Sequence, residues 1–473
     1  MQQYSYEIFT SVIEEQIKNE TFRNGDRLPS VRAIKEKYHI SVSSVQSGYE
    51  YLMLKGLVKS NPRSGYFVDY QNDKIPKAET KLLPVSKDVA FSKNVLLTSA
   101  RDKPSAINSF NNTAPGDFLV PQKLILRTMQ EVIREKGSAL LRYYPPNGSF
   151  ELRNLIADRM NKLNCSMNAE EIIITDGTLQ ALFIALHTVT KEGDVIAIES
   201  PCVFSVLEVA ANLNLKIIEI PVNYQDGFDI EYLKKVCETN TIKALVVTPN
   251  FHNPTGILMK EETKKDLAEL AENFQFPIIE NDIYGDIYFS EKRPTCIKSF
   301  DQKGWVITVS SFSKTLAPGI RLGWLNAGKF YAQAEKSKFS LGRTVSPIYQ
   351  ELMIKLLIKN SYDRHLRSFR KKLNQQAMLL LNTLRTYFPK DSYFHQPEGG
   401  YSIWGELPER IDMDKFYEYC EKNRILFTPG NTFSVSGEYK RCFRIVFAEY
   451  MNTESLELIK KAGEKARELW VEI

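Results

Sequence analysis

The hydrophobic residues at the start of the chain are spaced as they are in helices. Between Tyr4 and Glu20 the apolar positions fall on one helical face: Ile8, Val12, Ile13 and Ile17. After the turn FRNGDRLPS, a short helix is predicted from Ser30 or a neighbour through Lys37. The segment HISVSSVQSGYEYLMLKG then predicts a turn and a helix that ends at Gly56. Its inward-facing positions are Val45, Tyr49 and Leu52.

Two short β runs follow these helices. LVKSNPRSGYFV places apolar residues on both sides of the turn Asn-Pro-Arg-Ser-Gly, which is typical of a β-wing. A helix, a helix–turn–helix and a wing in this order predict a winged-helix DNA-binding domain over residues 1–70. The segment has nine Lys or Arg and eight Asp or Glu, a net charge of +1, so contact with DNA would depend on a positioned face and not on bulk charge.

The pattern changes again after residue 70. Residues 71–105 are polar, Lys-rich and interrupted by prolines, and we expect a linker that is partly extended and partly docked. From 106 to 473, amphipathic helical stretches alternate with short apolar runs such as EEIIITDGT, DVIAIESP, IKALVVTPN, FPIIENDIY and WVITVSS. Strands buried on both faces predict an α/β fold with a mostly parallel sheet. The last part, about 345–473, predicts a smaller α+β lobe.

The composition adds limits on the class of protein. A chain of 473 residues suits two or three domains, and its net charge of +5 is mild. Six scattered cysteines, without a CxxC pair or a His/Cys cluster, favour reduced thiols over a disulfide framework or a metal site. No apolar run approaches the length of a membrane span, and MQQYSYEIF does not resemble a signal peptide. We therefore expect a cytoplasmic protein with no metal and no membrane partner.

Polar residues stand where several predicted strands end, which is the edge at which α/β sheets bind ligands. The strand IIIT leads into Gly177 and Thr178, where the N–H groups of a starting helix and a hydroxyl can cradle a phosphate. Two other strand ends supply an amide, Asn253, and an acid with a phenol, Asp282 and Tyr284.

The run SSFSKTLAPGIRLGW, residues 310–324, follows the last of these strands. The amine of Lys314 can form a Schiff base with an aldehyde. Three residues can donate hydrogen bonds to a phosphate dianion: Ser311, Ser313 and Arg321. An aldehyde and a phosphate on one small molecule indicate pyridoxal 5'-phosphate (PLP). PLP also requires a carboxylate that keeps its pyridine nitrogen protonated, and hydrogen bonds to its ring hydroxyl.

These motifs resemble two known families. Residues 106–473 resemble the fold-type I PLP-dependent aminotransferases through TDGTLQAL, NFHNPTG, ENDIYGD, SSFSKTLAPGIRLGW and FRIVFA. Residues 4–68 resemble the winged helices of the GntR family through GDRLPSVRAIKEKY and NPRSGYFV. Joined by a linker, the two are similar to the MocR subfamily of GntR transcription regulators, and the resemblance covers nearly the whole chain.

The aminotransferase resemblance implies a role for individual residues. Lys314 would form the internal aldimine with PLP, Asp282 would contact the pyridine nitrogen, and Arg444 would bind the carboxylate of a substrate or effector. Asn253 and Tyr284 would contact the ring hydroxyl. The residues that would hold the phosphate are Gly177, Thr178, Leu179 through its N–H, Ser311, Ser313 and Arg321, with Tyr143 lent to the partner subunit.

Three positions depart from the aminotransferase pattern. The residue expected to stack on the ring is Val203, with Phe204 beside it as the alternative. Many relatives place the acid three residues before the tyrosine, which is Asn281 here; we assign Asp282, because a neutral amide would not protonate the pyridine. NNTAPGDF lacks the glycine expected at the substrate pocket, so the ligand preference stays open.

The GntR resemblance implies which residues face DNA. They are Arg32, Ser41, Ser43, Ser44 and Gln46, with Arg63 and Gly65 at the tip of the wing. Val42 stands where many GntR proteins have an arginine early in the recognition helix. A contact with a thymine methyl, or no base contact, is therefore expected there instead of a guanine contact.

Three functions fit these residues. In the first, the chain is a transcription regulator in which an amine or amino acid replaces Lys314 in the Schiff base and thereby alters the affinity for a DNA operator. In the second it is a working aminotransferase, and in the third it senses PLP itself. We favour the first, and we expect a homodimer because PLP sites of this class lie between subunits and winged helices usually read paired half-sites. The effector, the operator and the choice between activation and repression stay open.

Overall fold

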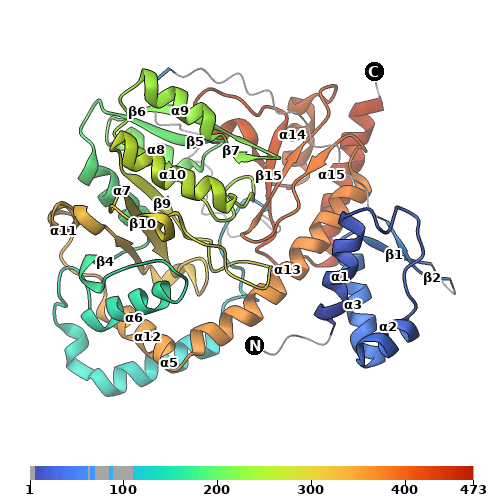
Figure 1. Ribbon diagram of the computed structural model, residues 1–473, viewed down its shortest axis with the longest axis horizontal. Helices are drawn as coiled ribbons and strands as arrows, with labels where there is room; N and C mark the ends of the chain where they lie inside the picture. The colour runs from blue at the N-terminus through green and yellow to red at the C-terminus, as the bar shows by residue number, and fades with distance from the viewer. Residues whose placement is uncertain (1–5, 62–63, 70–84, 89–109, 472–473) are drawn as a thin grey trace.

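The computed structural model describes residues 6–61, 64–69, 85–88 and 110–471. It contains a small domain built from the start of the chain and a much larger α/β domain (Figure 1). Arg63 lies outside the described residues. So does the predicted linker, except for residues 85–88. No described helix is both long enough and apolar enough to cross a membrane.

The small domain has the predicted winged-helix order. Its elements are α1 (Glu7–Lys18), α2 (Val31–Tyr38), α3 (Val42–Leu54) and an antiparallel hairpin of β1 (Val58–Asn61) and β2 (Gly65–Val68). Side-chain oxygens start both helices of the helix–turn–helix: Ser30 accepts from the Ala33 N–H at 3.2 Å, and Ser41 accepts from the Ser44 N–H at 3.0 Å.

One apolar cluster holds the small domain together. Its buried members are Phe9, Ile13, Ile17, Leu28, Ile34, Val45, Tyr49, Leu52, Leu57, Val58 and Val68. The predicted inward positions of α3 are confirmed, but the predicted stripe of α1 is wrong at one position: Ile8 is 42% exposed and Phe9 is buried in its place. The Tyr49 hydroxyl donates to the carbonyl of Pro29, so a buried polar group ties α3 to the turn that precedes α2.

A mixed sheet forms the centre of the large domain. Its strands are β3 (Lys87–Asp88), β4 (Ile172–Thr175), β5 (Val195–Ser200), β6 (Lys216–Asn223), β7 (Gly227–Phe228), β8 (Ala244–Val247), β9 (Ile278–Asn281), β10 (Val306–Ser311) and β11 (Gly323–Asn326). The order is β3-β6-β5-β8-β9-β10-β11-β4, with β7 beside β6. From β6 to β10 the neighbours are parallel, whereas β11 is antiparallel to both β10 and β4. The predicted parallel centre is therefore present, with antiparallel strands added at its edges.

Helices cover both faces of this sheet, as the fully apolar strands require. The helices of the large domain are α5 (Gln122–Lys136), α6 (Phe150–Asn161), α7 (Thr178–Val189), α8 (Phe204–Asn212), α9 (Ile230–Thr239), α10 (Glu261–Phe274), α11 (Tyr331–Ser340) and α12 (Pro347–Ile358). Along β9, Ile278 packs in one core cluster with α9 and α10, and Ile279 packs in another with α7 and α8. Successive side chains of β9 therefore face opposite helical layers.

The smaller lobe is an antiparallel sheet packed on helices. Its strands, in spatial order, are β12 (Tyr393–Phe394), β13 (Ser402–Glu406), β15 (Cys442–Val446) and β14 (Thr428–Pro429). Its helices are α13 (Ser361–Tyr387), α14 (Met413–Lys422) and α15 (Thr453–Val471). α12 shares an apolar cluster with α6 and β4, whereas α13 packs with the smaller lobe from Phe369 onward; the predicted boundary near residue 345 stays a prediction.

Two contacts join the small domain and a short part of the predicted linker to the large domain. Lys87 and Asp88 extend the sheet as β3, antiparallel to β6, with the Lys87 amine 3.4 Å from the Glu219 carboxylate. The end of α3 lies beside α13, where the Asn382 amide donates to the Met53 carbonyl at 3.3 Å (Figure 1).

The hydrogen bond from Tyr49 to Pro29 gives a stability prediction. Tyr49→Phe leaves the Pro29 carbonyl without its partner inside the domain, so we expect it to lower the free energy of unfolding of the small domain by about 1–2 kcal/mol. Hydrogen exchange of α2 and α3 in the full chain would measure this loss. Tyr66→Phe is the matched control, since Tyr66 stacks on Tyr49 with ring centroids 3.9 Å apart. An equal loss in both variants would contradict the prediction.

Candidate functional site

Lys314 lies in the turn that follows β10, at the carboxyl edge of the sheet. The Tyr401 hydroxyl, from the smaller lobe, donates to the Lys314 carbonyl and holds this turn in place. Burial and the charges of Arg444 and Arg321 lower the pKa of Lys314 to about 8. Within the described part of the chain no carboxylate lies within ion-pair distance of the amine. A larger share of Lys314 than of an ordinary lysine is therefore neutral and nucleophilic near neutral pH.

The start of α7 forms a cradle for an anion. Gly177 precedes the helix with a φ of 98°, and the Arg321 guanidinium donates to the Asp176 carbonyl at 2.9 Å. A Cβ on Gly323 would lie 2.6 Å from the Gly177 carbonyl carbon, so β11 can approach α7 this closely only through a glycine. The Thr178 hydroxyl is buried and has no hydrogen-bond partner among the residues described.

Two serines complete the cradle at the end of β10. The Ser311 hydroxyl donates to the Leu322 carbonyl and lies 2.9 Å from the Ser313 hydroxyl, and it accepts from the Ser313 N–H. Leu179 is in the first turn of α7, where its N–H has no acceptor within the helix. Helix N–H groups, hydroxyls and a guanidinium at one helix start fit a phosphate dianion.

Arg444 is a buried cation from β15, and the described groups that it contacts are all neutral. Its side chain is 1% exposed, and it donates to Asn253 Oδ1 at 2.9 Å, to the Asn111 carbonyl at 2.8 Å and to the Thr428 hydroxyl at 3.2 Å. Its Nε has no partner in the described structure, which also contains no carboxylate paired with it. Burial lowers the pKa of Arg444 to about 10. A buried guanidinium without an anion is unstable by several kcal/mol unless a ligand supplies one, so this position fits a carboxylate.

Asn253 links Arg444 to the next predicted residue. Its Nδ2 donates to the Tyr284 hydroxyl at 3.1 Å, while its Oδ1 accepts from Arg444. Burial raises the pKa of Tyr284, so the phenol keeps its proton at neutral pH. The structure thus brings together an amide, a phenol and a guanidinium whose charge also acts on Lys314.

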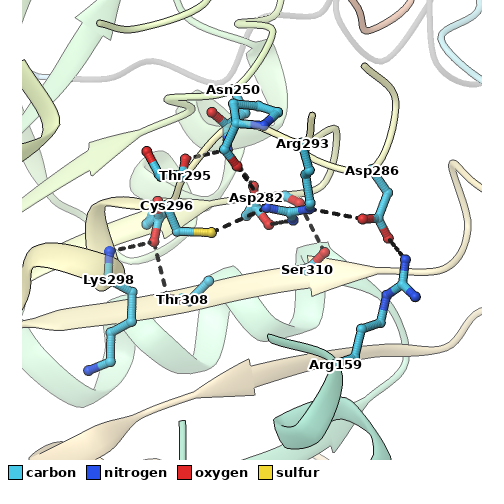
Figure 2. A network of polar contacts seen from close by, with 12 residues as sticks. Arg159, Asn250, Asp282, Asp286, Arg293, Thr295, Cys296, Lys298, Thr308 and Ser310 are labelled. Atoms are coloured by element: carbon cyan, nitrogen blue, oxygen red, sulfur yellow. Dashed lines mark hydrogen bonds and ion pairs between the residues drawn. The ribbon is translucent and has the colours of Figure 1, made fainter. Parts of the chain in front are cut away.

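Asp282 does not join this group. Its Oδ1 accepts from the Asn250 amide at 2.8 Å, and its Oδ2 forms an ion pair with Arg293 (Figure 2). Arg293 in turn contacts Asp286 at 2.9 Å. Both carboxylate oxygens are engaged in a buried network on the α10 side of the sheet, and the assignment of the pyridine contact to Asp282 stays a prediction.

Three further residues were predicted to contact the cofactor: Val203, Phe204 and Tyr143. Val203 caps α8 and packs with the α7 and α8 cluster, whereas the ring of Phe204 lies 6.2 Å from that of Phe433. Tyr143 is 86% exposed, which leaves it accessible to another subunit. The stacking residue and the role of Tyr143 stay predictions.

The residues predicted to face DNA lie mostly on the surface of the small domain. Ser43 and Gln46 are exposed and Ser44 is half-buried. The Arg32 side chain is 88% exposed and 3.0 Å from the Glu36 carboxylate. The Ser41 hydroxyl caps α3 and lies 2.8 Å from the hydroxyls of Ser43 and Ser44, and its contact with DNA stays a prediction.

Val42 and the wing complete this surface. Val42 is 45% exposed at the start of α3, as a residue that contacts a thymine methyl would be. Gly65 lies at the wing with a φ of 103°, and a Cβ there would lie 3.8 Å from the Arg27 guanidinium. Arg27 is an exposed cation that the sequence interpretation missed, although a basic residue in the turn GDRLPS is a signal for it.

Three other residues of the site were also missed. Asn250 opens the motif NFHNPTG and was identifiable as a second amide in it, but it holds Asp282. Arg293 and Tyr401 lie in irregular segments far along the chain, and nothing in their sequence surroundings marks them.

Comparison with known proteins gives two family matches. Residues 111–461 match the family Aminotransferase class I and II, and residues 9–68 match Bacterial regulatory proteins, gntR family. The HTH-type transcriptional regulator YjiR of Escherichia coli K12 is 31% identical over 97% of this chain and 98% of its own length. The HTH-type transcriptional regulator NorG of Staphylococcus aureus USA300 is 29% identical over 92% of this chain and 97% of its own.

Solved structures resemble the large domain. A multiple substrate aminotransferase from Thermococcus profundus superposes with a TM-score of 0.75 at 26% identity, over 81% of this chain and 96% of that one. A kynurenine aminotransferase from Pyrococcus horikoshii, in complex with PMP, also has a TM-score of 0.75 at 26% identity, over 80% and 95%.

The surroundings of Lys314 predict how its reactivity depends on pH. Because its pKa is lowered to about 8, the rate at which Lys314 condenses with the aldehyde of PLP should rise with pH up to about 8 and then level off. Stopped-flow absorbance would follow the reaction. Lys314→Ala should abolish it, whereas Lys292→Ala, which removes an exposed lysine, should not. A rate that keeps rising past pH 10 would indicate an ordinary surface amine and would contradict the prediction.

Proposed function

We propose that the chain is a PLP-binding transcription regulator that responds to an amine or amino acid. The premise is its family: it belongs to the class I and II aminotransferases and carries a gntR-family DNA-binding domain, the combination that defines MocR regulators. That it is a transcription regulator with an aminotransferase-like domain follows from the two matches and from its relatives. The cofactor and the response to an effector are the parts we propose.

The residues present fit PLP. The start of α7, with the partnerless Thr178 hydroxyl and Arg321, suits a phosphate, and Lys314 offers an amine with a lowered pKa. Asn253 and Tyr284 offer an amide and a protonated phenol to a ring hydroxyl. When bound, PLP supplies an aldehyde that captures amines reversibly.

Arg444 is the observation that carries the proposed effector. Its guanidinium is buried, has no carboxylate partner within the described residues, and is near enough to Lys314 for its charge to lower the pKa of the amine. A ligand with a carboxylate and an amine satisfies both positions, because the carboxylate neutralises Arg444 while the amine takes the place of Lys314. An α-amino acid carries both groups.

The position of these two residues suggests how an effector changes DNA binding. Arg444 belongs to the smaller lobe and Lys314 to the large sheet, so a ligand held by both favours one arrangement of the two lobes. α13 belongs to the core of the smaller lobe, and its Asn382 contacts Met53 at the end of α3. A shift of α13 therefore acts directly on the helix predicted to read DNA. The size of the effect is set by the difference in effector affinity between the two arrangements.

A matched pair of variants tests the role in DNA binding. A duplex selected from a random library by the full protein would serve as the operator. Arg32→Ala should weaken its binding about 10- to 100-fold, because one well-placed arginine contact contributes about 1–3 kcal/mol. Arg364→Ala, which removes an exposed arginine on α13, should leave it unchanged. Fluorescence anisotropy would measure the affinity, and the absorbance of bound PLP should be the same in both variants. Equal affinity in Arg32→Ala and the unmodified protein would contradict the docking.

A second pair of measurements tests the effector. In Arg444→Gln, amino acids should lose at least about 10-fold in the concentration that shifts operator affinity, since a buried charge-assisted pair with a carboxylate contributes about 1.4 kcal/mol or more. Simple amines that lack a carboxylate should act equally on both proteins, which makes them the control. Steady release of 2-oxo acid over many turnovers would instead support a working aminotransferase.

A further inference from the structure

Three consecutive residues at the end of β9 decide which group faces the cofactor ring. Glu280 and Asp282 flank Asn281, and side chains alternate between the two faces of a strand. The Glu280 carboxylate accepts from the Lys298 N–H and from the Thr308 hydroxyl, both at 3.2 Å, on the same side as the α10 cluster. Asp282, two residues later, faces that same side.

The network around Asp282 keeps it there. Asn250, which binds its Oδ1, also accepts from the buried Lys264 amine at 2.8 Å. Arg293, which pairs with its Oδ2, is buried as well and is held by Asp286 at 2.9 Å (Figure 2). Rotating Asp282 toward the other face would leave Arg293 with one carboxylate fewer and break the hydrogen bond from Asn250, which costs several kcal/mol in a buried network.

Asn281 faces the opposite side, toward α7. It pairs in register with Val309 of β10, and Val309 packs in one cluster with Ala181 and Leu182 of α7. Asn281 is 8% exposed, and its Oδ1 has no hydrogen-bond partner within the described chain. The Thr178 hydroxyl, at the start of α7, is a second buried oxygen without a partner. Both polar atoms therefore lie on the face of the sheet that carries the phosphate cradle.

We propose that Asn281, and not Asp282, contacts the ring nitrogen of PLP, and that its neutral amide leaves this nitrogen unprotonated. The proposal rests on the proposed function, in which PLP occupies this site. An amide can donate its Nδ2–H to an unprotonated nitrogen, but it carries no negative charge that would favour a pyridinium. The charged groups that act on Lys314 are both cations, Arg444 and Arg321, and the phenol of Tyr284 keeps its proton. Nothing on this side replaces the missing carboxylate among the groups described.

The consequence is a site that captures amines without converting them. Transamination moves a proton from the α-carbon of the amino acid to the cofactor, and water then releases a 2-oxo acid while the amino group stays on the cofactor. The electron pair left when the α-proton departs must be drawn into the ring, which an unprotonated pyridine does poorly. Binding through the amine and the carboxylate needs no such electron sink. Lys314 and Arg444 therefore suffice for reversible capture.

The protonation of the ring nitrogen can be read directly. PLP labelled with 15N in the ring, bound to the unmodified full chain, should give the chemical shift of an unprotonated pyridine. In Asn281→Asp the resonance should move to the pyridinium position. The isosteric change Asp282→Asn is the matched control, and it should leave the ring resonance as in the unmodified protein while lowering thermal stability. A pyridinium shift in the unmodified protein that is lost in Asp282→Asn would overturn the proposal.

A kinetic measurement provides a second arm. Single-turnover conversion of a bound amino acid to its 2-oxo acid should be at least about 10-fold faster in Asn281→Asp, because a tenfold change corresponds to only about 1.4 kcal/mol of the barrier. An unchanged rate would count against the proposal. Failure of PLP to bind the unmodified chain would overturn both this proposal and the proposed function, whereas binding with a protonated ring would overturn this proposal alone.

Discussion

The buried charge of Arg444 is the constraint on which the rest of the site depends. Its guanidinium is removed from water at the junction of the two lobes, and among the described residues it donates hydrogen bonds only to Asn253, Thr428 and a backbone carbonyl. Neutral acceptors fix its position but do not cancel its charge, so burial lowers its pKa and its charge in turn lowers the pKa of Lys314. One uncompensated cation thus prepares two properties at once, which are an affinity for carboxylates and a nucleophilic amine.

Contacts between the two lobes connect the site around Arg444 with α13. Arg444 and Lys314 are carried by different layers, and Tyr401 of the smaller lobe binds the Lys314 carbonyl while its ring lies 6.4 Å from that of Phe369 on α13. The same helix contacts α3 through Asn382. A domain that only catalysed a reaction would not need this contact with the DNA-binding helix. In the proposed function, this contact is the route by which the occupancy of the small-molecule site would reach the winged helix.

The sequence allowed most of the fold and much of the site to be predicted, and the failures have a common cause. Short apolar runs with turn residues located the strands, and the residues after them pointed to Lys314 and Thr178, whereas Arg444, inside β15, was predicted from the aminotransferase resemblance. Periodicity did not decide between adjacent residues: Ile8 and Phe9, like Asn281 and Asp282, differ by one position, and in a strand one position changes the face. In the structure, Asn250 and Arg293 bind the carboxylate of Asp282, and their distance from it in sequence concealed this contact.

A neutral partner for the ring nitrogen is what a receptor of amines requires. If the site converted its effector, each binding event would destroy the signal and leave the cofactor in its amine form, which has no aldehyde with which to capture the next molecule. Lys314 and Arg444 are retained, and recognition of the effector is preserved because both residues bind it before any reaction step. Replacing the pyridine-facing acid by Asn281 weakens only the step that follows recognition, the one in which charge develops on the ring. The carboxylate stands one residue later, at Asp282. Its negative charge there pairs with Arg293 and does not act on the cofactor.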